Sequence, residues 1–240
     1  MGNEIVVNEK ISENISVMST TNLIRFEDAL FEKTIDLRAD VKLHFDTAYE
    51  VDKLNSRVNL VKGVTYDKND QVYEATDRII LTADNITLSN KLNVVKQVYL
   101  AESFAPNEKS KLSKEDVFVC LSSGSVKHIG KVAYISADTQ YYAGGFMGIL
   151  RKRDDISDEK NVSMRYIYAI LSSRTFREYL TEISKGMGSN IKNLNDSIGE
   201  FKFPFPPFEI QEKIAEELTL IDDAIDFEEQ KEKILDKYLK

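Results

Sequence analysis

The segment 201-FKFPFPPFEIQEKIAEELTLID-222 divides the chain into two parts of different character. Its alternating Phe and Pro residues predict an extended backbone, and Pro206–Pro207 cannot continue a strand. From Glu209 to Lys240 there is no Gly or Pro, and apolar residues recur every three or four positions. That spacing is typical of an amphipathic helix. We therefore predict a domain boundary at Pro207, followed by one long helix.

The apolar stripe of this helix requires a partner. Its residues are Ile210, Ile214, Leu218, Ile221, Ile225, Leu235 and Leu239. A helix with one apolar stripe and a charged remainder must bury that stripe against another element. The stripe could fold back onto the preceding domain, or it could pair with an external or antiparallel helix. The length of the helix and its polar majority favour the second alternative.

The region before the boundary has strand character. Short β-branched and aromatic runs recur over residues 58–150, and turn-forming clusters separate them, which predicts a twisted, mainly antiparallel sheet or barrel. Residues 162–183 switch to helical spacing, with a break at Ser173–Arg174. Near-helical spacing also predicts a helix over 40–54. The two glycines of GMGSN, residues 186–190, exclude a rigid helix there.

These patterns predict an α/β protein of the α+β type, in which flanking helices accompany a β-rich domain and a long coiled-coil-like helix follows. We expect an N-terminal arm over residues 1–22, one domain over 23–207, and a spacer or dimerisation helix over 208–240.

Length and composition indicate a globular protein of a reducing compartment. The chain has 240 residues, of which 42% are hydrophobic, and that is enough for one sizeable core. No apolar run approaches the roughly 20 residues of a membrane span, and the N-terminus lacks the features of a secretory signal. The single cysteine, Cys120, lies in the apolar run VFVCL and is predicted to be a core residue. We expect a cytoplasmic location and no membrane association.

The net charge of −8 argues against nucleic acid as a partner until its distribution is considered. Residues 206–240 hold 11 acids and 5 bases, and residues 1–20 hold 3 acids and 1 base. The region 85–205 holds 17 bases and 13 acids, a net charge of +4. The negative charge therefore lies mainly at the two ends, and the body can present a basic face.

Motifs of common enzymes are missing from the sequence. It has no phosphate-binding loop and no dinucleotide fingerprint. The stretch FPPF, residues 205–208, has Phe where a DNA amino-methyltransferase needs a polar residue. His44 and His128 lie 84 positions apart without companions at metal-ligand spacing. The acids of 154–159 are interpreted as a solvated loop. We therefore expect no catalytic residue, no metal site and no cofactor.

Four phrases resemble one known family in their order. They are RIILTADNI at 78–86, KLSKEDVFVCLSSGSVKHIGKVAYI at 111–135, YYAGGFMGILR at 141–151, and the segment 186–222 that contains GMGSN and PPFEIQ. Together they resemble the target-recognition domain and spacer helix of the specificity subunits of Type I restriction–modification systems, over roughly residues 60–240. Such subunits usually carry two recognition domains and two spacer helices. This chain has one of each, so it looks like a half-subunit or a piece of a longer chain.

The resemblance implies a subunit without catalysis of its own. Its partners would be double-stranded DNA, a methyltransferase subunit and, in a restricting complex, a restriction subunit. Two antiparallel spacer helices, in a homodimer or with a second recognition domain, would set the distance between two half-sites. A different class of function, a helix-mediated assembly or adaptor module that does not bind DNA, remains the alternative.

Sequence readout requires hydrogen-bonding groups on loops that a rigid sheet holds in place. The candidate DNA-binding residues are Thr82, Asn85, Ser122, Ser123, Ser125, Lys127, Lys131, Tyr141, Lys185, Ser189, Asn190 and Lys192. Structural roles compete with binding at some of these positions. Asn85 could cap a turn, and the SSGS loop could be a plain hairpin turn. Gly144–Gly145 could exist to let Phe146 into the core.

Overall fold

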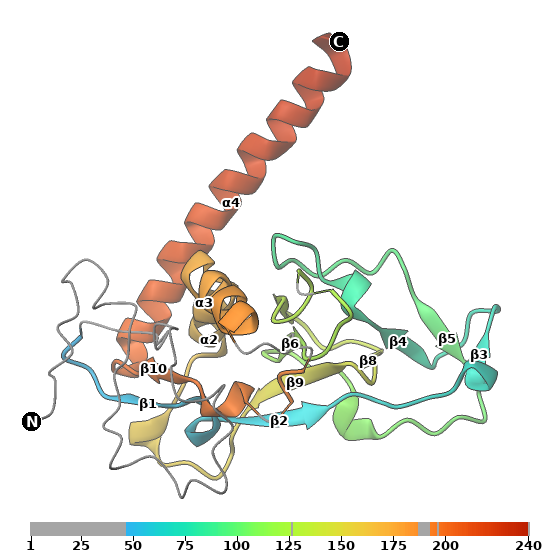
Figure 1. The fold of residues 1–240 in the computed structure, drawn as a ribbon, viewed down its shortest axis with the longest axis horizontal. Helices are drawn as coiled ribbons and strands as arrows, with labels where there is room; N and C mark the ends of the chain where they lie inside the picture. Colours follow the sequence, from blue (N-terminus) through green and yellow to red (C-terminus); the bar gives the residue numbers. More distant parts are fainter. Residues whose placement is uncertain (1–46, 126, 187–192, 196, 240) are drawn as a thin grey trace, which may run out of the picture.

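The computed structural model describes residues 47–125, 127–186, 193–195 and 197–239. The N-terminal arm predicted over 1–22 lies outside these residues. Two four-stranded sheets and one two-stranded ribbon, together with three α-helices, make up the described fold (Figure 1). The predicted α+β class, with a β-rich domain, is confirmed.

The first sheet is antiparallel, with strand order β2-β9-β6-β7. Its strands are β2 (Val58–Lys62), β9 (Met147–Lys152), β6 (Val117–Cys120) and β7 (Val132–Tyr134). The central strand β6 is wholly buried because apolar side chains cover both of its faces. A continuous apolar run such as VFVC is the pattern expected for such a strand.

The second sheet is mixed, with strand order β3-β5-β4-β8. Its strands are β3 (Gln71–Val72), β5 (Val98–Leu100), β4 (Ile79–Leu81) and β8 (Tyr141–Ala143). β3 and β4 each pair antiparallel with β5, whereas β4 and β8 are parallel, with Leu81 opposite Ala143. The prediction of a mainly antiparallel sheet is therefore confirmed, with one parallel pair that the sequence did not predict.

The helix predicted over 40–54 is wrong where the structure describes it. Val51–Lys53 form strand β1, which pairs antiparallel with β10 (Lys202–Pro204). The Phe- and Pro-rich stretch is extended, as expected. It pairs with Val51–Lys53 to form a two-stranded ribbon. Hydrogen bonds to a partner some 150 residues away outweigh the weak local preference for helix.

Two helices cover the first sheet. They are α2 (Met164–Ser172) and α3 (Arg174–Gly186), and Ser173 separates them as predicted. The hydroxyl of Ser173 accepts a hydrogen bond from the Phe176 amide at 3.2 Å, which favours a new helix start. The predicted apolar stripe is buried in the core. Its residues are Met164, Ile167, Leu171, Phe176 and Leu180.

The long C-terminal helix α4 (Phe208–Leu239) extends away from the sheets (Figure 1). Gln211 holds its first turn, because the Gln211 side chain accepts from the Ser163 amide at 2.9 Å and donates to the Pro206 carbonyl at 2.7 Å. Ile214 and Ala215 pack against the core that contains α2. No helix in the described part of the chain combines the length and the apolar character that crossing a membrane requires.

The stripe of α4 is therefore divided between two roles. Ile214 packs against its own domain, which corrects its assignment to an external interface. Leu218 and Ile221 are 40% and 54% exposed, and Ile210 is 37% exposed. The side chains of the other predicted interface residues, Ile225, Leu235 and Leu239, lie outside the described set.

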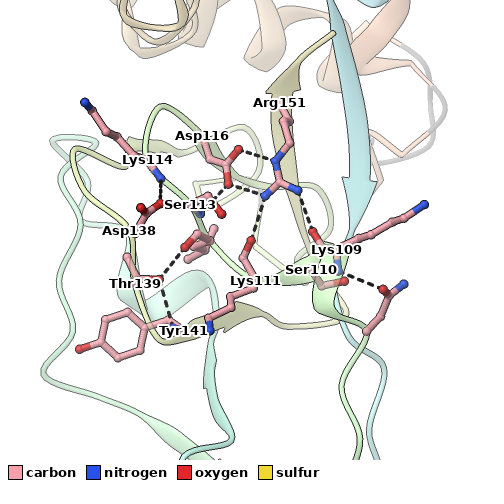
Figure 2. A network of polar contacts seen from close by, with 12 residues as sticks. Lys109, Ser110, Lys111, Ser113, Lys114, Asp116, Asp138, Thr139, Tyr141 and Arg151 are labelled. Atoms are coloured by element: carbon pink, nitrogen blue, oxygen red, sulfur yellow. Dashed lines mark hydrogen bonds and ion pairs between the residues drawn. The ribbon is translucent and has the colours of Figure 1, made fainter. Parts of the chain in front are cut away.

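A buried ion pair fixes the loop before β6 to the first sheet (Figure 2). The guanidinium of Arg151, on β9, donates to both carboxylate oxygens of Asp116, at 2.8 and 2.7 Å. It also donates to the carbonyls of Lys109 and Lys111. Asp116 is 2% exposed and also accepts from the Ser113 amide at 2.7 Å. The pair thereby satisfies three backbone groups of one loop and its own charges.

We expect Asp116→Ala to lower the free energy of unfolding by about 2–3 kcal/mol, because Arg151 and the Ser113 amide lose their acceptor. Urea denaturation measures the change. Arg153 and Asp155 form a similar two-bond pair, but the Asp155 side chain is 66% exposed, so Asp155→Ala should leave stability nearly unchanged. Equal losses for the two variants would refute the role given to burial.

Burial raises the pKa of the Cys120 thiol to about 11, and Cys120 lies within β6, as predicted for a core residue. At about pH 8 the native chain should not react with a thiol reagent, whereas the chain in urea should react at once. The unfolded thiol ionises near its ordinary pKa of 9.0, so the fold should lose stability as the pH rises from there towards 11. Rapid labelling of the native chain would contradict this burial.

Candidate nucleic-acid interface

One groove, with a volume of about 700 Å³, collects loops that lie far apart in the sequence. Its walls come from residues 64–71, 82–84, 122–124 and 144–147. Hydroxyls, carboxylates, one amide and one ammonium line it beside two aromatic side chains. The groove therefore offers both hydrogen-bond donors and acceptors in one concave surface.

The parallel pairing of β4 with β8 explains why two of these loops meet. Both strands end at the same edge of the sheet, so the segments that follow Leu81 and Ala143 begin side by side. The Gly144 amide donates to the Leu81 carbonyl at 2.8 Å, and the Val64 amide donates to the Ala143 carbonyl at 2.7 Å. A third segment is thereby held against the first two through backbone atoms alone.

Gly63 permits this approach. A Cβ atom at position 63 would lie 1.9 Å from the Gly144 carbonyl oxygen, so any other residue would push β2 away from the β8–β9 turn. The requirement comes from space and not from an unusual backbone angle.

Thr82 and Ser123 reach the groove, as their assignment as DNA-binding residues requires. Both are partly exposed and line the groove, and so does Ser122. The Ser122 amide donates to the Phe146 carbonyl at 3.1 Å, which joins the SSGS loop to the turn between β8 and β9. The structure thus joins the phrases 111–135 and 141–151 at Ser122 and Phe146, which are 24 positions apart in the sequence.

Asn85 does not reach the groove, and its assignment as a base reader is corrected. It is 1% exposed. Its carbonyl oxygen accepts from the Thr82 amide at 2.8 Å, and its amide donates to the carbonyls of Asn93 and Lys96. Both the oxygen and the nitrogen of its side-chain amide therefore bond the backbone of the loop 82–96. The alternative interpretation, a turn cap, is the one that the structure supports.

Lys131 is also corrected. Its side chain is 2% exposed, and its ammonium donates to the carbonyls of Ala83 and Ile86. Burial lowers the pKa of Lys131, and two carbonyls partly compensate the charge. The residue supports the 83–86 turn from beneath and cannot also meet a phosphate.

Ser125 and Lys127 are exposed beyond the groove wall. The backbone beneath them is fixed, because Arg177 of α3 donates to the carbonyls of Lys127 and Ile129. Lys127 is therefore an exposed residue on a segment whose backbone is supported. His128 follows it, and burial lowers the pKa of this histidine.

Tyr141 lies in β8, half-buried against the core that contains Phe118 and Ile149, and is not among the groove residues. Lys185 falls in the last turn of α3, and its side chain is outside the described set. Ser189, Asn190 and Lys192 also lie outside it. Asn193, which follows them in the sequence, forms an antiparallel bridge with Ser122.

Sequence reasoning missed the wall formed by 64–71 and misplaced Phe146. Thr65, Tyr66, Lys68 and Gln71 line the groove, although the sequence predicts only a turn-forming cluster between two strands here. Phe146 is 73% exposed, so the expectation that Gly144–Gly145 admits it to the core is wrong. The sequence does contain a signal for this wall: Gly63 directly follows strand β2, and the polar turn 67–70 comes after it.

The electrostatics of the groove are mixed. The cation Lys68 and the carboxylates of Asp67 and Asp84 line it. Asp84 also forms an ion pair with Lys96 at 3.2 Å. Among the described residues, no group of three or more His, Cys, Asp or Glu could hold a metal ion. The arrangement suits hydrogen bonding to a polar surface, with cations at its margin.

Known proteins match the chain over most of its length. The model of the type I restriction modification DNA specificity domain matches residues 49–237. The type I restriction enzyme EcoKI specificity subunit of Escherichia coli (strain K12) is 29% identical over 164 residues, which are 68% of this chain and 33% of that protein. The StySPI specificity subunit of Salmonella potsdam is 31% identical over 165 residues, 68% of this chain and 34% of that protein. The chain thus spans about a third of the length of these relatives.

Solved structures share the fold. The S subunit of a type I restriction–modification system from M. genitalium has a TM-score of 0.52 at 16% identity, over 78% of this chain and 43% of that chain. A chain from a study of assembly and conformational transition of the type I R-M system has a TM-score of 0.57 at 14% identity, over 82% and 44%. At these identities the similarity establishes the fold alone. The family model, however, covers well over half of the sequence, and the predicted resemblance is confirmed: the chain belongs to the type I restriction–modification DNA specificity family.

Proposed function

We propose that this chain is a DNA-binding specificity module without catalysis of its own, whose groove reads a short sequence. Residues 23–207 would form the recognition domain, and 208–240 the spacer. The observation that carries the proposal is the groove itself, in which loops from both sheets present polar groups on a backbone that hydrogen bonds hold fixed. Its occurrence in a member of a DNA specificity family supports DNA as the ligand.

The lining suits base edges. Thr82 and Ser123 carry hydroxyls that can donate or accept, and Asp84 can accept from the cytosine amino group. Bases are discriminated by such patterns of donors and acceptors in the major groove. Lys127, exposed outside the groove, would contact a phosphate and position the duplex without reading it.

The exposed part of α4 would bind partner subunits. Beyond its first two turns, Leu218 and Ile221 face solvent, and an antiparallel second helix would bury them. That helix would come from a second copy in a homodimer or from a second recognition domain. A methyltransferase subunit, joined in a restricting complex by a restriction subunit, would supply the chemistry.

A helix-mediated adaptor without DNA binding is the second candidate. The net charge of −8 favours it. Salt discriminates between the two functions, because affinity that depends on phosphate contacts falls steeply as salt rises, whereas an apolar protein interface does not weaken in this way.

Ser123→Asp should weaken DNA binding at least about tenfold, because it adds a negative charge at the groove that faces the polyanion. The ligand is a duplex that the wild-type chain enriches from a randomised pool, and fluorescence anisotropy over a salt series gives Kd. Asn59→Asp is the matched control, since Asn59 is exposed on β2 and is not among the groove residues. Equal affinities for the two variants would exclude the groove from the interface, and no enrichment at any salt would favour the adaptor.

Leu218→Asp combined with Ile221→Asp should raise the dissociation constant of the helix pair at least about a hundredfold, since two apolar side chains lose their burial. Sedimentation equilibrium measures mass for the chain alone and with a methyltransferase subunit. Glu216→Ala, an exposed change on the same helix, should leave the mass unaltered. An undiminished assembly in the double variant would rule out pairing through this stripe.

A further inference from the structure

Phe146 is an apolar side chain displayed in a polar groove. It lies in the turn between β8 and β9 with 73% of its surface exposed, beside Ser122 and Ser123. Leaving a phenyl group in water forgoes the free energy that burial would give it. The protein retains it at the surface that we assign to DNA.

The backbone that carries Phe146 is fixed on two sides. The Phe146 carbonyl accepts from the amides of Leu121 and Ser122, at 3.0 and 3.1 Å. The Met147 amide closes the turn onto the Gly144 carbonyl at 2.8 Å. On the other side, a Cβ at Gly145 would lie 3.2 Å from the Val64 carbonyl oxygen. The phenyl group therefore projects from a supported position, and only its own side-chain torsions are free.

Chemistry restricts what such a group can distinguish. In the major groove every base edge presents hydrogen-bond donors or acceptors, and thymine alone adds a projecting apolar group, its 5-methyl. A phenyl group against the cytosine amino group would remove water from it without replacing the hydrogen bond, which is unfavourable. Against a methyl group the same contact removes apolar surface from water on both sides.

We propose that Phe146 is a specificity-determining residue that selects a 5-methylpyrimidine, thymine in unmodified DNA, at one position of the target. The inference rests on the proposed function and deepens it. Thr82 and Ser123 would read neighbouring base edges by hydrogen bonds, and Phe146 would read one position by apolar contact.

Deoxyuridine tests this directly, because it differs from thymidine only by the methyl group. In the duplex enriched by the full wild-type chain, each thymine is replaced in turn by uracil and Kd is measured. At one position uracil should weaken binding by about fourfold, the value of one buried methyl group. Phe146→Ala should bind the thymine and uracil duplexes equally there, while it keeps the wild-type penalties for base changes elsewhere.

Tyr73→Ala is the control, since Tyr73 is a fully exposed aromatic that does not line the groove. It should keep the full preference for thymine, and thermal melts should match for all three proteins. A retained thymine preference in Phe146→Ala would overturn the inference. So would a wild-type chain that enriches a sequence but responds to no uracil, and in that case the proposed function stands. If no sequence is enriched, the proposed function falls and the inference falls with it.

Discussion

The contact between the end of β2 and the turn joining β8 to β9 determines how the walls of the groove are arranged. Backbone lies against backbone there, with no room for a Cβ at Gly63. The contact brings the segment 64–71 beside the loops that leave β4 and β8, whose parallel pairing already aligns their ends. Because main-chain groups make these bonds, this contact does not depend on which side chains line the groove.

Local patterns in the sequence predicted the elements well where neighbours along the chain decide them. The break at Ser173, the buried strand around Cys120 and the helix after Pro207 follow from caps, apolar runs and proline. Strand β1 did not follow, because its partner β10 lies about 150 residues away. Pairings of that range leave no periodic trace in the segment itself.

The candidate site shows the same division. Lys127 and Lys131 lie four positions apart and look alike in sequence, yet one ammonium is exposed and the other is buried against two carbonyls. Asn85 has the hydrogen-bonding groups of a base reader, and the loop uses them internally. Which polar residue meets solvent depends on carbonyls contributed by remote segments, so residue type alone could identify the loops but not the residues that project from them.

Gln211 connects the β-rich domain to α4, and this connection affects how the sequence of such a protein can evolve. Its side-chain amide bonds main-chain groups of Ser163 and Pro206. The direction in which α4 leaves the β-rich domain is therefore set by backbone positions and by Gln211, which lies outside the groove. Substitutions among the groove side chains leave those bonds intact. Under the proposed function, new target preferences can therefore accumulate while the geometry presented to partner subunits stays constant, and recognition can diverge without the assembly having to diverge with it.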